Sequence, residues 1–185
     1  QALLLQAERE LGASLEQLGQ YASDASSNEA RAYLPLLLSA SQHLAKLSLA
    51  RDKLVSSGRS ELAGDVEREL DSIALQARQI DALPLLGVNS TSASGTDDFA
   101  AMMGLDATDT AKAEDAGIGL KRELNSLLSR YPAELKRTQN QIEQRSQLSA
   151  ATHLKLDAVQ QAIAELEPVV RAEHAHIQNE VRLIQ

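Results

Sequence analysis

Two arginines fall at positions where helical spacing predicts apolar side chains. Arg51 continues an apolar stripe that runs in steps of three and four through residues 37–54, and Arg145 continues a similar stripe through residues 135–145. A guanidinium that faces a helical interior is costly unless an anion pairs with it. Because no Asp or Glu lies three or four residues from either arginine, each partner must come from elsewhere.

The sequence leaves three possibilities open for each arginine. In the first two, its partner is a carboxylate ligand, which Arg holds bidentately, or an acidic residue of a neighbouring helix. In the third, the arginine lies at the edge of its stripe and its head group reaches water.

Hydroxyl side chains accompany these arginines. Ser41 and Ser48 border the stripe of Arg51, and Thr138 lies within the later stripe. Such a hydroxyl can bond the preceding helical turn, or it can donate to a bound acid. We therefore predict a ligand site drawn from Arg51, Arg145, Thr138 and Ser41.

Other kinds of site are not indicated. The sequence contains no nucleophile elbow, phosphate-binding loop or dinucleotide-binding motif, so we predict no catalytic residue, no enzyme and no cofactor. Glu173, His176 and Glu180 share a helix face as metal ligands do, but no second such motif occurs on another helix. The pattern favours a solvated polar face opposite the apolar stripe, and no metal site is predicted.

Composition limits the classes of protein that remain. Hydrophobic residues make up 43% and aromatic residues 2%, so Leu and Ala must form the core, as in helical bundles. A net charge of −8 without a basic cluster argues against nucleic-acid binding. The chain has no Cys, which removes disulfides and thiolate chemistry.

Apolar periodicity predicts an all-α fold, an elongated bundle of about five long antiparallel helices. A break or kink is expected at Pro132, since proline disfavours helical geometry in the residue before it. Residues 87–98 are rich in turn formers and are expected to form a flexible loop, followed by a short apolar patch at 99–105 that would cap one end. The expected helices cover approximately residues 4–22, 37–54, 62–80, 109–131 and 133–184.

Two segments resemble the ligand-binding regions of bacterial chemoreceptors, the methyl-accepting chemotaxis proteins. Residues 44–66 read LAKLSLARDKLVSSGRSELAGDV, an arginine-containing helix followed by a Ser-Gly turn and a helix that opens Glu-Leu-Ala. Residues 123–138 read ELNSLLSRYPAELKRT and are similar to the helical bimodular sensor family.

That resemblance implies a periplasmic domain of an inner-membrane protein. Members form two stacked four-helix bundles that share long helices, and they bind small organic acids such as tricarboxylic-acid-cycle intermediates. We accordingly expect residues 1–185 to form one sensor domain of a longer, homodimeric receptor that signals by helix displacement. The sequence has no apolar run of the roughly 20 residues that span a bilayer, so flanking transmembrane helices are expected outside it.

Two alternatives remain. The same domain can belong to a sensor histidine kinase. In the second alternative, the chain is a coiled-coil interaction module without a small-molecule site. The near-heptad pattern of residues 156–184 favours this alternative. The module predicts exposed apolar stripes, with Arg51 and Arg145 paired by carboxylates of the protein.

Overall fold

The computed structural model describes residues 2–88 and 115–184, all of whose regular elements are helices. It divides into two units, Gln1–Asn140 and Gln141–Gln185, which are described separately. The elements are α1 (Ala2–Ala25), the 3₁₀ helix η1 (Glu29–Ala32), α2 (Tyr33–Ser57), the 3₁₀ helix η2 (Ser60–Leu62), α3 (Ala63–Asp81) and α5 (Ala116–Leu183).

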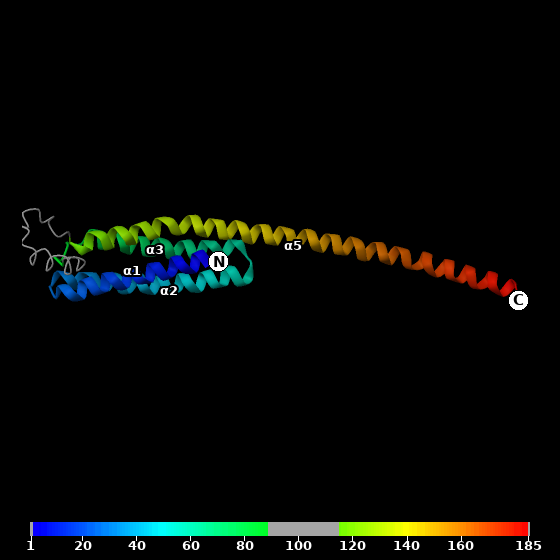
Figure 1. The fold of residues 1–185 in the computed structure, drawn as a ribbon, viewed down its shortest axis with the longest axis horizontal. Coiled ribbons are helices and arrows are strands. Elements are labelled where there is room, and N and C mark those ends of the chain that lie inside the picture. Colours follow the sequence, from blue (N-terminus) through cyan, green and yellow to red (C-terminus); the bar gives the residue numbers. More distant parts are fainter. Residues whose placement is uncertain (1, 89–114, 185) are drawn as a thin grey trace, which may run out of the picture. The chain divides into compact units, whose positions relative to one another are not determined.

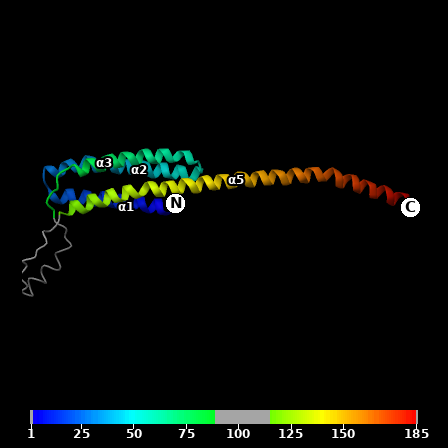
Figure 2. The ribbon, with the colours of Figure 1, turned by 90° about the horizontal axis from the view of Figure 1, so that it is seen from above.

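The first unit is a helical bundle in which α1, α2, α3 and the part of α5 up to Asn140 lie side by side (Figures 1 and 2). Each helix contributes leucine or isoleucine side chains at three- and four-residue spacing, and these form the buried core: Leu11 of α1, Leu47 of α2, Ile73 of α3 and Leu124 of α5 are at most 1% exposed. Burial of one such side chain contributes roughly 1.5–3 kcal/mol. The predicted all-α fold with a leucine-rich core is confirmed for the described residues of this unit.

Short connections join α1 to α2 and α2 to α3, so the helices of each pair are antiparallel. Gly58 ends α2 with a φ of 66°, and its N–H donates to the carbonyl of Leu54 at 3.1 Å. A side chain at this position would be strained, because L-residues rarely adopt the left-handed conformation. Gly58 therefore caps the C-terminal end of α2.

Of the break or kink predicted at Pro132, the break is wrong, because α5 continues through this residue, and the kink stays a prediction. A proline removes one backbone hydrogen bond, and its neighbours Tyr131 and Leu135 are at most 1% exposed. Packing of these side chains offsets the lost bond, so the two helices expected on either side of Pro132 form one. The described residues consequently contain four α-helices where about five were predicted.

The second unit is described as the continuation of α5, in which the side chains of residues 143–184 are exposed. Among the described residues, no helix is both long enough and apolar enough to cross a membrane. Of the expected loop at 87–98, only Gly87 and Val88 fall within the described residues, and the apolar patch at 99–105 lies outside them. The single domain 1–185 and a second stacked bundle remain predictions.

Candidate functional site

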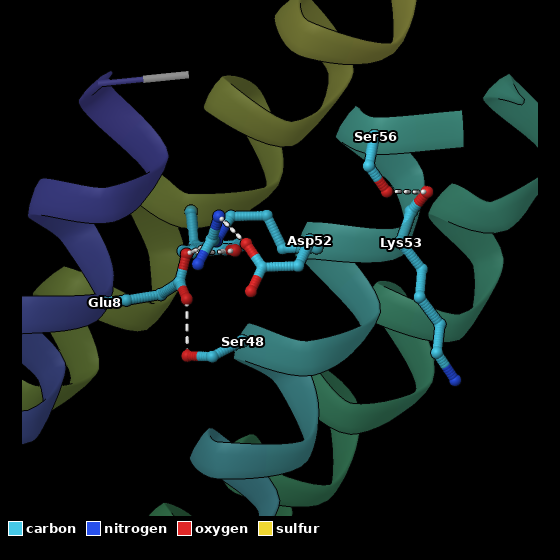
Figure 3. Close-up of polar contacts among 7 residues, drawn as sticks. Glu8, Ser48, Asp52, Lys53 and Ser56 are labelled. Carbon is cyan, nitrogen blue, oxygen red and sulfur yellow. Dashed lines mark hydrogen bonds and ion pairs between the residues drawn. The ribbon is translucent and has the colours of Figure 1, made fainter. Parts of the chain in front are cut away.

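A polar cluster lies inside the first bundle, and we call it the central cluster. It consists of Glu8 of α1, Ser48, Arg51 and Asp52 of α2, and Tyr131 of α5. Arg51 Nε meets Glu8 Oε2 at 2.5 Å, and Arg51 Nη1 donates to Asp52 Oδ1 at 2.8 Å. Ser48 Oγ donates to the other oxygen of Glu8 at 2.5 Å, and Figure 3 shows Ser48 and Glu8 facing each other.

Burial makes this ion pair energetically important. Glu8 is 6% exposed and Arg51 8%, whereas the side chain of Asp52 is 68% exposed. Removal of one partner from a buried pair typically costs about 3–5 kcal/mol, because the other charge is left without compensation. Nε of Arg51 is also a buried atom without a hydrogen bond of good geometry, so its contact with Glu8 is purely ionic.

Tyr131 is the fully buried member of the central cluster. Its hydroxyl donates to Glu8 Oε2 at 3.4 Å, a long and weak bond. Burial, followed by the charge of Glu8, raises the pKa of Tyr131 far above its ordinary value. The side chain therefore remains a neutral phenol that can donate a hydrogen bond to a carboxylate.

The structure places the four predicted ligand residues in different environments. Arg51 is buried within the central cluster, and Thr138 of α5 is buried at 6% exposure. Ser41 is exposed on α2, and Ser48, which was considered beside it, is the serine that contacts Glu8. Arg51 and Thr138 are thus buried in the first unit and Ser41 is exposed there, and the ligand set as a whole stays a prediction.

Arg145 is exposed, as in the alternative that places it at the edge of its stripe with its head group in water. It lies in the second unit, whose described residues are a single helical stretch, so within that unit nothing covers its face. Periodicity identifies the face that a helix can bury, but burial also needs a packing partner.

Glu8 is the member of the site that the sequence argument missed. A signal for it existed, since Leu4, Glu8 and Leu11 are spaced by four and three residues, which places the acid on the apolar face of α1. Charges within three or four residues of Arg51 could not reveal this partner, which comes from a different helix. A search for oppositely charged residues on separate apolar stripes would have paired Glu8 with Arg51.

A second polar cluster, which we call the end cluster, joins the segment after α3 to the start of α5. Asp115 Oδ1 accepts hydrogen bonds from the hydroxyl of Tyr21 at 2.7 Å and the N–H of Gly117 at 2.8 Å. Its Oδ2 accepts from the N–H of Gly87 at 2.7 Å, and the Tyr21 oxygen accepts from the N–H of Leu86 at 2.7 Å.

The end cluster holds the carboxylate of Asp115 in its charged form. Burial raises its pKa, but the hydrogen bonds from Tyr21, Gly117 and Gly87 and the charge of Lys121 outweigh burial, and the pKa lies below its usual value. Burial raises the pKa of Tyr21, so the phenol keeps its proton. The end cluster therefore links α1, the segment after α3 and the start of α5 by hydrogen bonds.

A shallow groove of about 240 Å³ lies on the surface between α1 and α5 of the first unit. Its walls include Leu3 and Glu10 of α1 and Leu127, Arg130 and Glu134 of α5. Its volume is below the roughly 300–1,000 Å³ of typical ligand pockets, and two carboxylates flank its arginine. The groove is consequently poorly suited to binding an anion.

The paired acidic and histidine side chains near the C-terminus do not form a metal centre in the part of the chain that the structure describes. His176 Nε2 lies 3.4 Å from Glu180 Oε1, and both side chains are mostly exposed. An exposed pair of this kind contributes little to stability. The solvated polar face considered for these residues matches the structure.

The chain is similar over its whole length to a methyl-accepting chemotaxis protein. It is 58% identical over 189 residues to the methyl-accepting chemotaxis protein CtpL of Pseudomonas aeruginosa, covering 100% of this chain and 29% of that protein. The chain thus spans less than a third of the length of this relative. No family model matches the sequence, and no solved structure gives a significant match.

Identity at this level over the whole of this sequence establishes common ancestry. The chain is therefore homologous to a segment of a methyl-accepting chemotaxis protein, and the predicted resemblance to bacterial chemoreceptors is confirmed.

Proposed function

We propose that this chain is the periplasmic sensor domain of an inner-membrane chemoreceptor and that it binds a small organic acid between its helices. Similarity to a methyl-accepting chemotaxis protein favours a chemoreceptor over a sensor histidine kinase as the parent protein. Ligand binding biases the packing of the helices, and the resulting displacement passes to transmembrane helices outside this segment. The intact receptor acts as a homodimer.

One observation carries the choice of ligand class, the buried guanidinium of Arg51. Arginine presents donors whose geometry matches a carboxylate, and a desolvated guanidinium binds an anion more strongly than an exposed one. Arg51 already contacts a carboxylate, that of Glu8, with hydroxyl donors from Ser48 and Tyr131 on the same group. The central cluster is therefore built to hold a carboxylate, and it is the proposed ligand site.

Of the other predicted residues, buried Thr138 fits a role at this site better than exposed Ser41 and Arg145 do. Thr138 supplies a hydroxyl from α5, the helix that also carries Tyr131. Ser41 and Arg145 are exposed to solvent, and we assign them no part in binding the acid.

A thermal-shift screen against small carboxylates, amino acids and inorganic anions tests the proposal. An acid present at about 100 times its dissociation constant stabilises the fold by about 2.7 kcal/mol. We expect a selective increase in melting temperature from one class of acid in the wild-type chain and its loss in Arg51→Met. Arg68→Met is the matched control, since Arg68 is an exposed arginine of α3 with a 76% exposed side chain. A uniformly flat response would contradict the proposal.

The interaction module is a second candidate because two observations favour it. Arg51 is paired by a carboxylate of the protein, and the second unit exposes many apolar side chains, including Leu156, Val159 and Ile163. A module predicts self-association through this stripe, measurable as an increase in mass with concentration in analytical ultracentrifugation. Replacement of Val159 and Ile163 by Lys should abolish that increase, and a mass independent of concentration would count against the module.

A further inference from the structure

The carboxylate of Glu8 is held as a bound acid would be held. Both of its oxygens are engaged, Oε1 by the hydroxyl of Ser48 and Oε2 by Nε of Arg51 and by the hydroxyl of Tyr131. These two hydroxyls and the guanidinium come from α2 and α5, while the carboxylate comes from α1. The donor set therefore recognises a carboxylate as a group, whichever molecule presents it.

Charge balance decides how a second carboxylate can reach these donors. Arg51 already faces two carboxylates, those of Glu8 and Asp52. A ligand carboxylate that joined them would place three negative charges around one guanidinium in a largely dehydrated interior, which is strongly unfavourable. A ligand must accordingly take the place of one of them. Glu8 is the buried one, and it alone also occupies the hydroxyls of Ser48 and Tyr131.

We infer that Glu8 is an intramolecular surrogate ligand, and that a small carboxylate enters the site by exchanging with it. This inference rests on the proposed function and specifies how the same site is regulated. The exchange frees α1 from the hydroxyls of Ser48 and Tyr131 and the guanidinium of Arg51, so occupancy of the site is coupled to the position of α1. A tethered carboxylate competes at a high effective concentration, and it keeps the affinity for free acids low until the competitor is weakened.

Acetate is the probe, because it is the carboxylate of Glu8 without the tether. The melting temperature of the 185-residue chain is measured in sodium acetate and in sodium chloride at the same ionic strength. In Glu8→Ala the donors are vacant, and acetate at about ten times its dissociation constant should raise the melting temperature by roughly 3–5 °C relative to chloride. Wild type should give no such difference. Glu8→Ala/Arg51→Met should also give none, because the guanidinium that holds the acetate is absent.

Glu8→Gln is the second variant, and it decides the question if Glu8→Ala does not fold in either salt. The amide keeps the volume of the side chain but loses its charge, so it competes more weakly for Arg51. Acetate should stabilise Glu8→Gln more than wild type. Equal effects of acetate and chloride on a folded Glu8→Ala, or equal acetate effects on Glu8→Gln and wild type, would overturn the inference.

This outcome is separate from that of the proposed function. The wild-type acid screen can fail while acetate still stabilises Glu8→Ala, which would leave Glu8 as a surrogate for a carboxylate that the screen did not contain. It can also succeed while acetate has no effect on the variants, in which case the acid binds without displacing Glu8 and the exchange is refuted.

Discussion

Replacement of Glu8 by Gln should destabilise the bundle far more than the same change at an exposed glutamate. Glu8 is 6% exposed and is the buried counter-charge of Arg51, which is 8% exposed. Loss of a buried partner costs about 3–5 kcal/mol, and the contact of Arg51 with the exposed Asp52 places this case at about 3 kcal/mol. For a chain of this length that corresponds to a melting temperature lower by roughly 6–12 °C.

Urea denaturation followed by circular dichroism at 222 nm would measure this free energy. Glu10→Gln is the matched control, since Glu10 is exposed on the same helix and accepts a hydrogen bond from Gln6. We expect it to change stability by less than about 0.5 kcal/mol. The double variant Glu8→Leu/Arg51→Met should restore much of the loss, because apolar replacement of a buried pair is often neutral. Equal effects of Glu8→Gln and Glu10→Gln would refute the reasoning.

Three further predictions concern the end cluster. In urea denaturation, Gly117→Ala should destabilise the fold by about 1–3 kcal/mol, since its Cβ would lie 2.5 Å from Tyr21 Oη. Gly119→Ala is the control, because its Cβ would meet nothing within 4 Å, and it should stabilise α5 by up to about 1 kcal/mol. Tyr21→Phe should cost about 1–3 kcal/mol in the same assay, because the phenol both donates to Asp115 and accepts from Leu86. Because the pKa of Asp115 is lowered on folding, its carboxylate adds stability above about pH 4 that is lost as pH falls through the folded-state pKa. Asp115→Asn should therefore reduce the loss of stability at acid pH. Stability profiles of wild type and Asp115→Asn that run parallel with pH would contradict this prediction.

Much of the bundle could be predicted because its signals are local. Apolar side chains at three- and four-residue spacing located α1, α2 and α3, and Gly58 marked the end of α2. The continuity of α5 through Pro132 could not be predicted in this way. It depends on burial of Tyr131 and Leu135 against other helices, and that packing is a property of the assembled bundle.

The site was predicted in part for the same reason. The position of Arg51 on an apolar stripe indicated its burial correctly, and the need for an anionic partner followed from its charge. Its partner is 43 residues away on another helix, which local spacing cannot specify, although the place of Glu8 on the stripe of α1 contained the signal. Arg145 shows a second limit of predicting burial from helical spacing, because an apolar stripe that continues along a helix does not ensure that another helix covers it.

Isothermal titration calorimetry tests most directly whether this segment binds an acid at Arg51. The acid that gives the largest thermal shift is titrated into wild type, Arg51→Met and the exposed-site control Arg68→Met. Charge-assisted hydrogen bonds contribute about 1.5–3 kcal/mol, so the account predicts saturable binding that is at least about tenfold weaker in Arg51→Met and unchanged in Arg68→Met. Equal affinity of wild type and a folded Arg51→Met, or no binding to wild type, would contradict it.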